Sequence, residues 1–313
     1  MGFKHLVILG AGSIVATIPN GDKNGEKAFT LADLLTDPFL APFVERIQGK
    51  CDITDVEKLC QKLYVEDKSL YGEFESLVRE KYAKLELPNG FTILERLVLS
   101  LTHDDAIVSF NWDDLIVQAY NKALDCAPET ILPLLSFPHG SAQAVYNKKR
   151  YGSKRNPDNL DLWDSPLNMP VDETDYKDNL FIQSQWRILD FYFRNARMIT
   201  FFGYCGPPSD EKDMEHLESL IDANGICAKI EIIDKDLESA KRVSERLERF
   251  RSPDMGFYLC EDFWHSTIAK LPRRTISALE NWNYTPREAA KEESLAEFMG
   301  HVGPLMEEEL AQL

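Results

Sequence analysis

Five short runs of β-branched and other apolar residues recur at wide spacing along the chain, and the stretches between them have helical periodicity. The runs lie at residues 5–9, 106–110, 198–202, 229–233 and 257–260. Buried strands that alternate with amphipathic helices are typical of a parallel sheet that is covered on both faces by helices. The sequence therefore predicts an α/β fold built on such a sheet.

The spacing of apolar residues also predicts eight helices. In residues 71–85, Phe74, Leu77, Val78 and Tyr82 fall on one face, as a packed amphipathic helix requires. The eight segments are residues 55–64, 71–85, 92–101, 113–124, 181–195, 212–223, 237–250 and 264–271. The stretch between the first two strand runs is too long for a simple crossover, so we predict a helical insertion at about residues 20–101.

Two further stretches depart from this alternation. Residues 140–178 are rich in Asn, Asp, Pro and Lys, which predicts a long loop or a small irregular region. Residues 286–313 are strongly acidic, which predicts a helical tail on the surface. We therefore divide the chain into a domain of residues 1–285 and a C-terminal tail of residues 286–313.

Net charge and cysteine usage exclude some classes of protein. With 52 acidic and 35 basic residues among 313, the formal net charge is −17, so no direct nucleic-acid binding is expected. We find no signal peptide and no apolar run long enough to span a membrane. The six cysteines form no Cys-x-x-Cys pair. We therefore expect a cytoplasmic protein with reduced thiols and no structural zinc.

The first strand run leads into Gly10-Ala11-Gly12-Ser13. Glycines at this position let the backbone approach a pyrophosphate, and a following helix supplies N–H donors. The third glycine of the dinucleotide-binding fingerprint is absent, which argues against a hydride-transfer dehydrogenase. A tight structural turn is the alternative interpretation of this motif.

Asn111 and Asp113 follow the second strand run. Polar groups at the carboxyl end of a parallel strand point into the crevice where doubly wound sheets bind ligands. The same two residues are also suited to capping the helix that follows. Both interpretations are open on the sequence alone.

A histidine, His139, stands before Gly140 and just after another apolar run at residues 131–137. Histidine is the side chain best suited to proton transfer near neutral pH, and the glycine would let a substrate come close. A histidine without catalytic function in a loop is the alternative. No pair of histidines has the spacing of metal ligands with an acidic partner, so no catalytic metal is expected.

The third and fourth strand runs are each followed by candidate binding residues. Gly203 and Tyr204 begin a glycine turn, where backbone N–H groups could face a ribose or a phosphate. Asp234 ends the next run, where a carboxylate can accept hydrogen bonds from ribose hydroxyls. Asp234 is equally suited to capping the helix that begins near residue 237.

In this order, the motifs resemble those of the sirtuin-like family of NAD-consuming proteins. The resemblance is closer to the bacterial branch of NAD hydrolases than to the protein deacylases, and it extends from about residue 6 to about residue 271. The matching residues are Gly10-Ala11-Gly12-Ser13 with Pro19 in the glycine loop, Asn111 and Asp113 after a strand, the His139-Gly140 pair, and Gly203-Tyr204 with Asp210 beyond them.

Three features depart from the family pattern. The glycine loop is one residue shorter before Ser13 than is usual, and Thr17 stands where the family has a glycine. Residues 140–178 contain no cysteine, so we expect no zinc-ribbon module of the deacylase type. The Asp-Phe-Arg of deacylases is absent after Pro19.

The resemblance implies a Rossmann-like domain that takes NAD⁺ as a substrate and releases nicotinamide and ADP-ribose. It implies that Asn111 positions the ribose and the attacking water, that Asp113 orients the region of the nicotinamide ribose, and that His139 is the base. It implies no metal. The residues expected to contact NAD⁺ are Gly10, Ala11, Gly12, Ser13, Pro19, Gly203, Tyr204 and Asp234.

The resemblance also implies a setting. Similar bacterial domains act in antiphage defence by depleting NAD⁺, and assembly or a separately encoded partner releases their activity. We therefore expect a homo-oligomer and a regulatory partner such as an ATPase or an Argonaute-like protein, with the insertion or the acidic tail as a docking surface.

Other activities use the same kind of pocket. One is an NAD-dependent protein deacylase or ADP-ribosyltransferase, which the missing zinc module disfavours. Another is a sensor that binds NAD or ADP-ribose without turning it over. The presence of both Asn111 and His139 favours an enzyme over a sensor.

Overall fold

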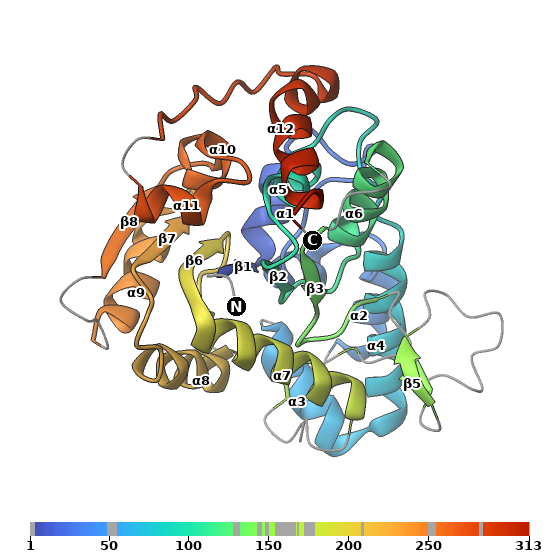
Figure 1. The fold of residues 1–313 in the computed structure, drawn as a ribbon. Helices are drawn as coiled ribbons and strands as arrows, with labels where there is room; N and C mark the ends of the chain where they lie inside the picture. Colours follow the sequence, from blue (N-terminus) through green and yellow to red (C-terminus); the bar gives the residue numbers. More distant parts are fainter. Residues whose placement is uncertain are drawn as a thin grey trace.

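The computed structural model describes residues 4–48, 55–127, 132–142, 146–147, 150–153, 167, 169–171, 179–207, 210–249, 255–281 and 284–312. A sheet of six parallel strands lies at its centre (Figure 1). The strands follow the order β3 (Leu134–Ser136), β2 (Ala106–Ser109), β1 (Lys4–Leu9), β6 (Ala196–Phe202), β7 (Lys229–Ile233) and β8 (Gly256–Cys260). The predicted α/β fold with a Rossmann-like parallel sheet is confirmed. No helix in the described ranges is long and apolar enough to cross a membrane.

Helices cover both faces of the sheet (Figure 1). In β1, Leu6 and Ile8 belong to one core and Val7 and Leu9 to the other, and all four are buried. This is why the central strand contains consecutive apolar residues instead of an alternation of apolar and polar ones. The core around Leu6 includes α7 (Leu180–Asn195), α8 (Glu211–Asp222) and α9 (Leu237–Glu248). The other core includes α1 (Ala11–Thr17), α5 (Ile93–Ser100), α6 (Leu115–Cys126) and α10 (Thr267–Lys270).

The predicted strand runs correspond to β1, β2, β6, β7 and β8. Of the predicted helices, the first two are α3 (Val56–Glu66) and α4 (Lys68–Ala83), which begin after the capping residues Asp55 and Asp67. The last predicted helix divides into a 3₁₀ helix (Phe263–His265) and α10. β3 was not predicted as a strand because it is short and its first residue, Leu134, is exposed at the edge of the sheet.

The helical insertion comprises a 3₁₀ helix (Leu31–Thr36), α2 (Ala41–Ile47), α3 and α4. Phe43 stacks on Phe74 inside it, with ring centroids 5.4 Å apart. Tyr82, near the end of α4, makes an edge contact with Trp112, which follows β2. The insertion therefore packs beside the carboxyl end of β2. α5, which the prediction included in the insertion, packs against α6 and α1 on the sheet itself.

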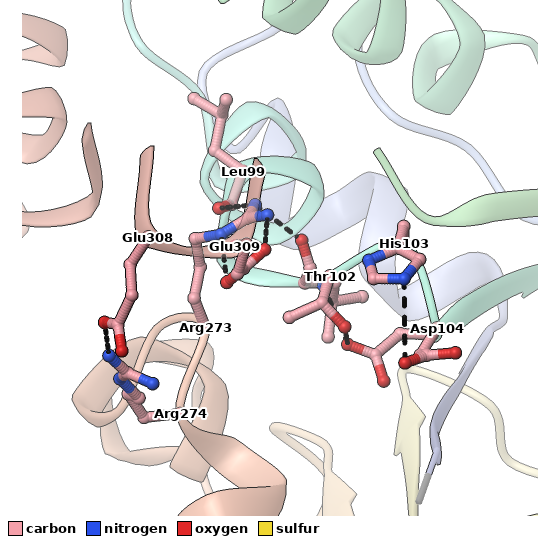
Figure 2. A network of polar contacts seen from close by, with 10 residues as sticks. Leu99, Thr102, His103, Asp104, Arg273, Arg274, Glu308 and Glu309 are labelled. Atoms are coloured by element: carbon pink, nitrogen blue, oxygen red, sulfur yellow. Dashed lines mark hydrogen bonds and ion pairs between the residues drawn. The ribbon is translucent and has the colours of Figure 1, made fainter. Parts of the chain in front are cut away.

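The acidic C-terminal segment packs against the body of the molecule. Its helix α12 (Leu295–Leu310) buries Phe298, Val302 and Met306 in the core that contains α5. At the end of α12, Glu309 and Glu308 pair with Arg273 and Arg274 (Figure 2). Carboxylates of this segment are thus used to attach it to the body.

Most of the irregular stretch predicted at residues 140–178 lies outside the described residues. Within it, β4 (Tyr146–Asn147) and β5 (Arg150–Ser153) pair as a short antiparallel hairpin apart from the main sheet.

Candidate active site

The strand order reverses between β1 and β6, because β2 and β3 extend the sheet on one side and β7 and β8 on the other. Open α/β sheets bind ligands at this switch point, beyond the carboxyl ends of the strands. A cavity of about 910 Å³ lies there. Its wall includes Gly10 and Ala11 after β1, Asn111 and Trp112 after β2, His139 after β3, Gly203 and Tyr204 after β6, and Asp210 and Asp213 at the start of α8.

The glycines after β1 and β6 let two turns pack backbone against backbone. The Gly12 N–H donates to the Gly203 carbonyl at 2.9 Å. A Cβ on Gly10 would lie 2.5 Å from that same carbonyl oxygen, and a Cβ on Gly12 would lie 2.7 Å from the Cα of Gly203. Gly203 itself has a φ of +63°. The structural role left open for the first glycine motif is therefore real, although Gly10 and Gly203 also line the cavity.

Asn111 ties β2 to the glycine turn. Its Nδ2 donates to the Gly10 carbonyl at 3.0 Å and lies 3.2 Å from the Ser13 hydroxyl. Ser13 in turn donates to the Gly10 carbonyl at 2.7 Å and is buried. Asn111 lines the cavity, whereas Ser13 and Gly12 lie behind its wall. The amide is thus held on the cavity wall by the turn that the sequence motif predicted.

His139 lies on the same cavity wall and is 8% exposed. Its Nε2 is 2.7 Å from Oδ2 of Asp213, which lies in the first turn of α8. The ring of Phe110 packs edge-on against the imidazole at 4.7 Å between centroids. An aromatic wall and a hydrogen-bonded carboxylate therefore fix the orientation of the ring.

The surroundings of His139 act on its pKa in opposite directions. Burial lowers the pKa, because the charged form loses solvation. The hydrogen bond to Asp213, the negative charges of Asp210 and Asp213, and the backbone of Phe110 all raise it. The result is a pKa above the usual value near 6.5, so the protein stabilises the imidazolium form.

Besides Gly12 and Ser13, three further residues predicted to act on or contact NAD⁺ do not line the cavity. Asp113 is buried at the start of α6, where its Oδ1 accepts the N–H of Leu115 at 2.9 Å. Asp234 accepts the N–H of Asp236 at 2.8 Å beyond β7. Pro19 is exposed in the turn after α1. Neither residue is the N-cap of the helix that follows, which is Asp114 for α6 and Asp236 for α9, but each accepts the backbone N–H two positions further along, as an aspartate in a turn does.

The sequence reasoning missed the acidic residue that contacts His139. Asp213 lies 74 positions further along the chain, and its only signal was its place in the first turn of a helix after the Gly203 turn. It also missed the wall that the insertion supplies, in which Leu31, Tyr82 and one side of α3 face the cavity. The part of the wall that comes from the insertion depends on how the insertion packs beside the strand ends, which no local sequence pattern shows.

The arrangement bears on metal binding as well. The atoms of His139, Asp210 and Asp213 that could hold a cation all lie within 4.8 Å of one another. A hydrogen bond already joins His139 to Asp213. The expectation that the protein needs no metal stays a prediction.

The cavity wall carries two chemically different kinds of side chain. Polar side chains on its wall include His139, Asn111, Asp210 and Asp213, and apolar or aromatic ones include Ile14, Leu31, Tyr82, Trp112, Met169 and Val171. The indole N–H of Trp112 is buried without a hydrogen-bond partner among the described residues. Such a cavity suits a ligand that has both an aromatic ring and polar sugar hydroxyls.

No protein-family model and no curated protein sequence matches the chain.

Proposed function

We propose that this protein is an NAD⁺ glycohydrolase, which cleaves NAD⁺ to nicotinamide and ADP-ribose. The supporting observation is that Gly10, Asn111, His139 and Gly203, from the ends of four strands, line one cavity at the switch point of the sheet. The cavity volume of about 910 Å³ is at the upper end of the range for small-molecule and cofactor sites. A dinucleotide is a ligand of suitable size and polarity.

The reaction requires little acid–base chemistry on the leaving group. As the bond between the ribose C1′ and the pyridinium nitrogen breaks, its electron pair leaves with nicotinamide, which departs as a neutral molecule. The sugar becomes oxocarbenium-like and is stabilised by a polar environment. In the proposed mechanism a water oxygen forms the new bond to C1′, and His139 accepts the proton of that water.

Asn111 has the positioning role in this mechanism. Its Nδ2 is engaged by Gly10 and Ser13, so the amide cannot rotate freely, and its carbonyl oxygen is left to orient the water or a ribose hydroxyl. Fixed orientation of reactants is a large part of the rate enhancement of enzymes. Asp113, which lies behind the wall, would act through the start of α6 rather than by touching the substrate.

We propose the same biological setting that the resemblance implied, namely bacterial antiphage defence by NAD⁺ depletion. Free NAD⁺ hydrolysis would drain a cell, so the activity is proposed to be released by homo-oligomer formation or by a separately encoded ATPase or Argonaute-like partner. With the acidic C-terminal segment attached to the body through arginines, the insertion is the better candidate for the docking surface.

The direct test is chromatography of NAD⁺ after incubation with the purified protein at low and high concentration, in the presence of EDTA. Nicotinamide and ADP-ribose are expected in equal amounts. His139→Ala and Asn111→Ala are each expected to lower the rate by about 10²–10⁴-fold, and His216→Ala, outside the cavity wall, is the matched control. Wild-type rates in both cavity variants would refute the site.

The same assay separates the alternatives. Acetyl-ADP-ribose formed with an acetylated peptide would indicate a deacylase, and ADP-ribose attached to a protein would indicate a transferase. NAD⁺ binding in calorimetry without any product, at all protein concentrations, would indicate a sensor.

A further inference from the structure

Asp213 interacts with the candidate base of the reaction and belongs to none of the sequence motifs. Its Oδ2 lies 2.7 Å from Nε2 of His139, and both side chains are buried. The carboxylate is in the first turn of α8, which follows β6, whereas His139 follows β3. The contact therefore joins two elements that are far apart in the chain.

We propose that Asp213 is a positioning residue for His139: it accepts the Nε2 hydrogen of the neutral imidazole and leaves Nδ1 as the nitrogen that takes up a proton. This inference rests on the proposed function of His139 as a base. A carboxylate can only accept at the 2.7 Å contact, so Nε2 is the nitrogen that carries hydrogen. The lone pair of the neutral ring is then on Nδ1.

The groups around the ring are suited to the imidazolium that forms when Nδ1 takes a proton. Asp213 and Asp210 place negative charge beside it, and a hydrogen bond to the backbone of Phe110 also raises the pKa of the ring. Tyr204 is neutral, because burial and the negative charges of both carboxylates raise the pKa of its phenol well above the usual value. The other charged residues on the cavity wall are Glu211, Lys212 and Glu215 of α8 and Glu57, Lys58, Lys62 and Glu66 of α3.

The pH dependence follows from this arrangement. A base must be unprotonated, so the rate rises as the pH increases through the pKa of His139, which is above its usual value in the wild type. Asp213→Asn removes one negative charge and the carboxylate acceptor. The pKa of His139 then falls, and the acid limb of the rate profile moves to lower pH. The plateau rate falls by about 10²-fold or more, because the ring loses its preferred tautomer.

The chain offers a matched control on the same helix. His216 of α8 makes an equally short contact, 2.7 Å from its Nε2 to Oδ1 of Asp190 on α7, and neither residue lines the cavity. Asp190→Asn removes the same kind of hydrogen bond next to the same elements. It is expected to leave the pH–rate profile and the titration of His139 unchanged.

The test is NMR titration of the protein labelled with ¹³C and ¹⁵N at histidine side chains, with His139→Ala to assign the resonance. The expected result is an Nε2–H tautomer for neutral His139 in the wild type, and a lower pKa with a mixed tautomer in Asp213→Asn. Asp210→Asn, which retains the hydrogen bond, is expected to lower the pKa without changing the tautomer. This variant also serves if Asp213→Asn does not fold.

The titration decides the proposal whether or not NAD⁺ is cleaved. An unchanged pKa and tautomer of His139 in Asp213→Asn, or an Nδ1–H tautomer in the wild type, would overturn the role of Asp213. An absence of NAD⁺ cleavage by the wild type with the expected titration would instead remove the proposed function and leave the pair intact.

Discussion

Among single residues, Asp113 shows how a buried carboxyl beside the site affects stability. Burial raises its pKa to about 7, with a smaller contribution from the charge of Asp114, while the hydrogen bond from the Leu115 N–H lowers it. One carboxylate oxygen of Asp113 has no partner among the described residues. The folded protein therefore holds a proton on Asp113 at pH values where the unfolded chain has lost it.

This difference has a definite sign. Because the folded-state pKa is above that of the unfolded chain, the free energy of unfolding should fall as the pH rises from about 4 to about 7. Asp113→Asn keeps an acceptor for Leu115 and cannot ionise. We expect the difference in free energy of unfolding, variant minus wild type, to be larger at pH 8 than at pH 4, by on the order of a few kcal/mol. Urea denaturation at several pH values measures this.

The control is Asp125→Asn, on the exposed end of the same helix, which should leave the pH dependence unchanged. Asp105, another buried carboxyl with a pKa raised by burial to about 6, is common to all three proteins and cancels in the comparison. Parallel loss of stability with pH in Asp113→Asn and the wild type would contradict the assignment.

At this scale the sequence allowed some site residues to be predicted and not others. Asn111 and His139 follow directly after apolar runs. Because the carboxyl ends of parallel strands lie at the same edge of a sheet, this position was enough to predict that both residues face one cavity. Asp213 is on a helix whose orientation depends on packing against the sheet, and no local pattern encodes that orientation. The sequence could not show that Asp113 faces away from the cavity while Asn111 faces it, because the direction of a side chain changes from one residue of a turn to the next.

At the scale of elements, the packing of the β1–α1 turn against the β6–α8 turn determines the shape of the site. A Cβ at Gly203 would lie 2.2 Å from the backbone nitrogen of Ser13 and 2.4 Å from the carbonyl carbon of Gly12. These are backbone atoms, which cannot rotate away as a side chain can. The φ of +63° adds a further cost for any residue with a Cβ.

We therefore expect Gly203→Ala to lower the free energy of unfolding by more than about 2 kcal/mol and to abolish NAD⁺ cleavage in the fraction that folds. The matched substitution is Gly72→Ala inside α4, where a Cβ would meet nothing within 4 Å. That variant should be more stable by about 0.5–1 kcal/mol, because alanine loses less entropy in a helix. Chemical denaturation of both compares them; a Gly203→Ala protein of wild-type stability would show that the turns can separate.

The long elements were predictable because their patterns are long. β1 ends in four consecutive apolar residues, five of the seven residues of β6 are apolar, and α9 follows a capping aspartate, Asp236. β3 has three residues, of which only Ser136 is buried, so periodicity has too little length to act on. The place of the insertion was predictable from its length, but its contribution to the cavity was not, because that depends on tertiary contacts such as the one between Tyr82 and Trp112.

At the scale of the whole molecule, the net charge of −17 means that carboxylates of packed acidic segments repel one another unless they are paired. In the C-terminal segment, carboxylates form ion pairs with arginines of the body. Arg96 pairs with Glu293 at 2.5 Å, with both side chains buried. Arg273 donates to the carbonyls of Leu99 and Leu101, at 3.2 and 2.8 Å, and pairs with Glu309 (Figure 2). One guanidinium thus joins the end of α5 to the end of α12.

The two neighbouring arginines provide a direct comparison of buried and exposed pairs. Arg273 has a side chain that is 1% exposed, whereas Arg274 is 25% exposed and its partner Glu308 is 52% exposed. Arg273→Ala would leave two carbonyls and a partly buried carboxylate without their donor, so we expect a loss of about 3–5 kcal/mol in the free energy of unfolding. Arg274→Ala should cost at most about 1 kcal/mol, because water solvates both charges and salt screens them.

Measuring the stability of both variants at low and at high salt gives a second test. The effect of Arg274→Ala should shrink between low salt and about 0.5 M NaCl, while that of Arg273→Ala should persist, because buried pairs are screened much less. If both variants lost the same small amount of stability, and lost it equally at high salt, the Arg273–Glu309 pair would not be what holds α12, and apolar contacts such as those of Phe298, Val302 and Met306 would attach it. The acidic C-terminal segment would then have carboxylates available for a partner, and it would return as a candidate docking surface beside the insertion.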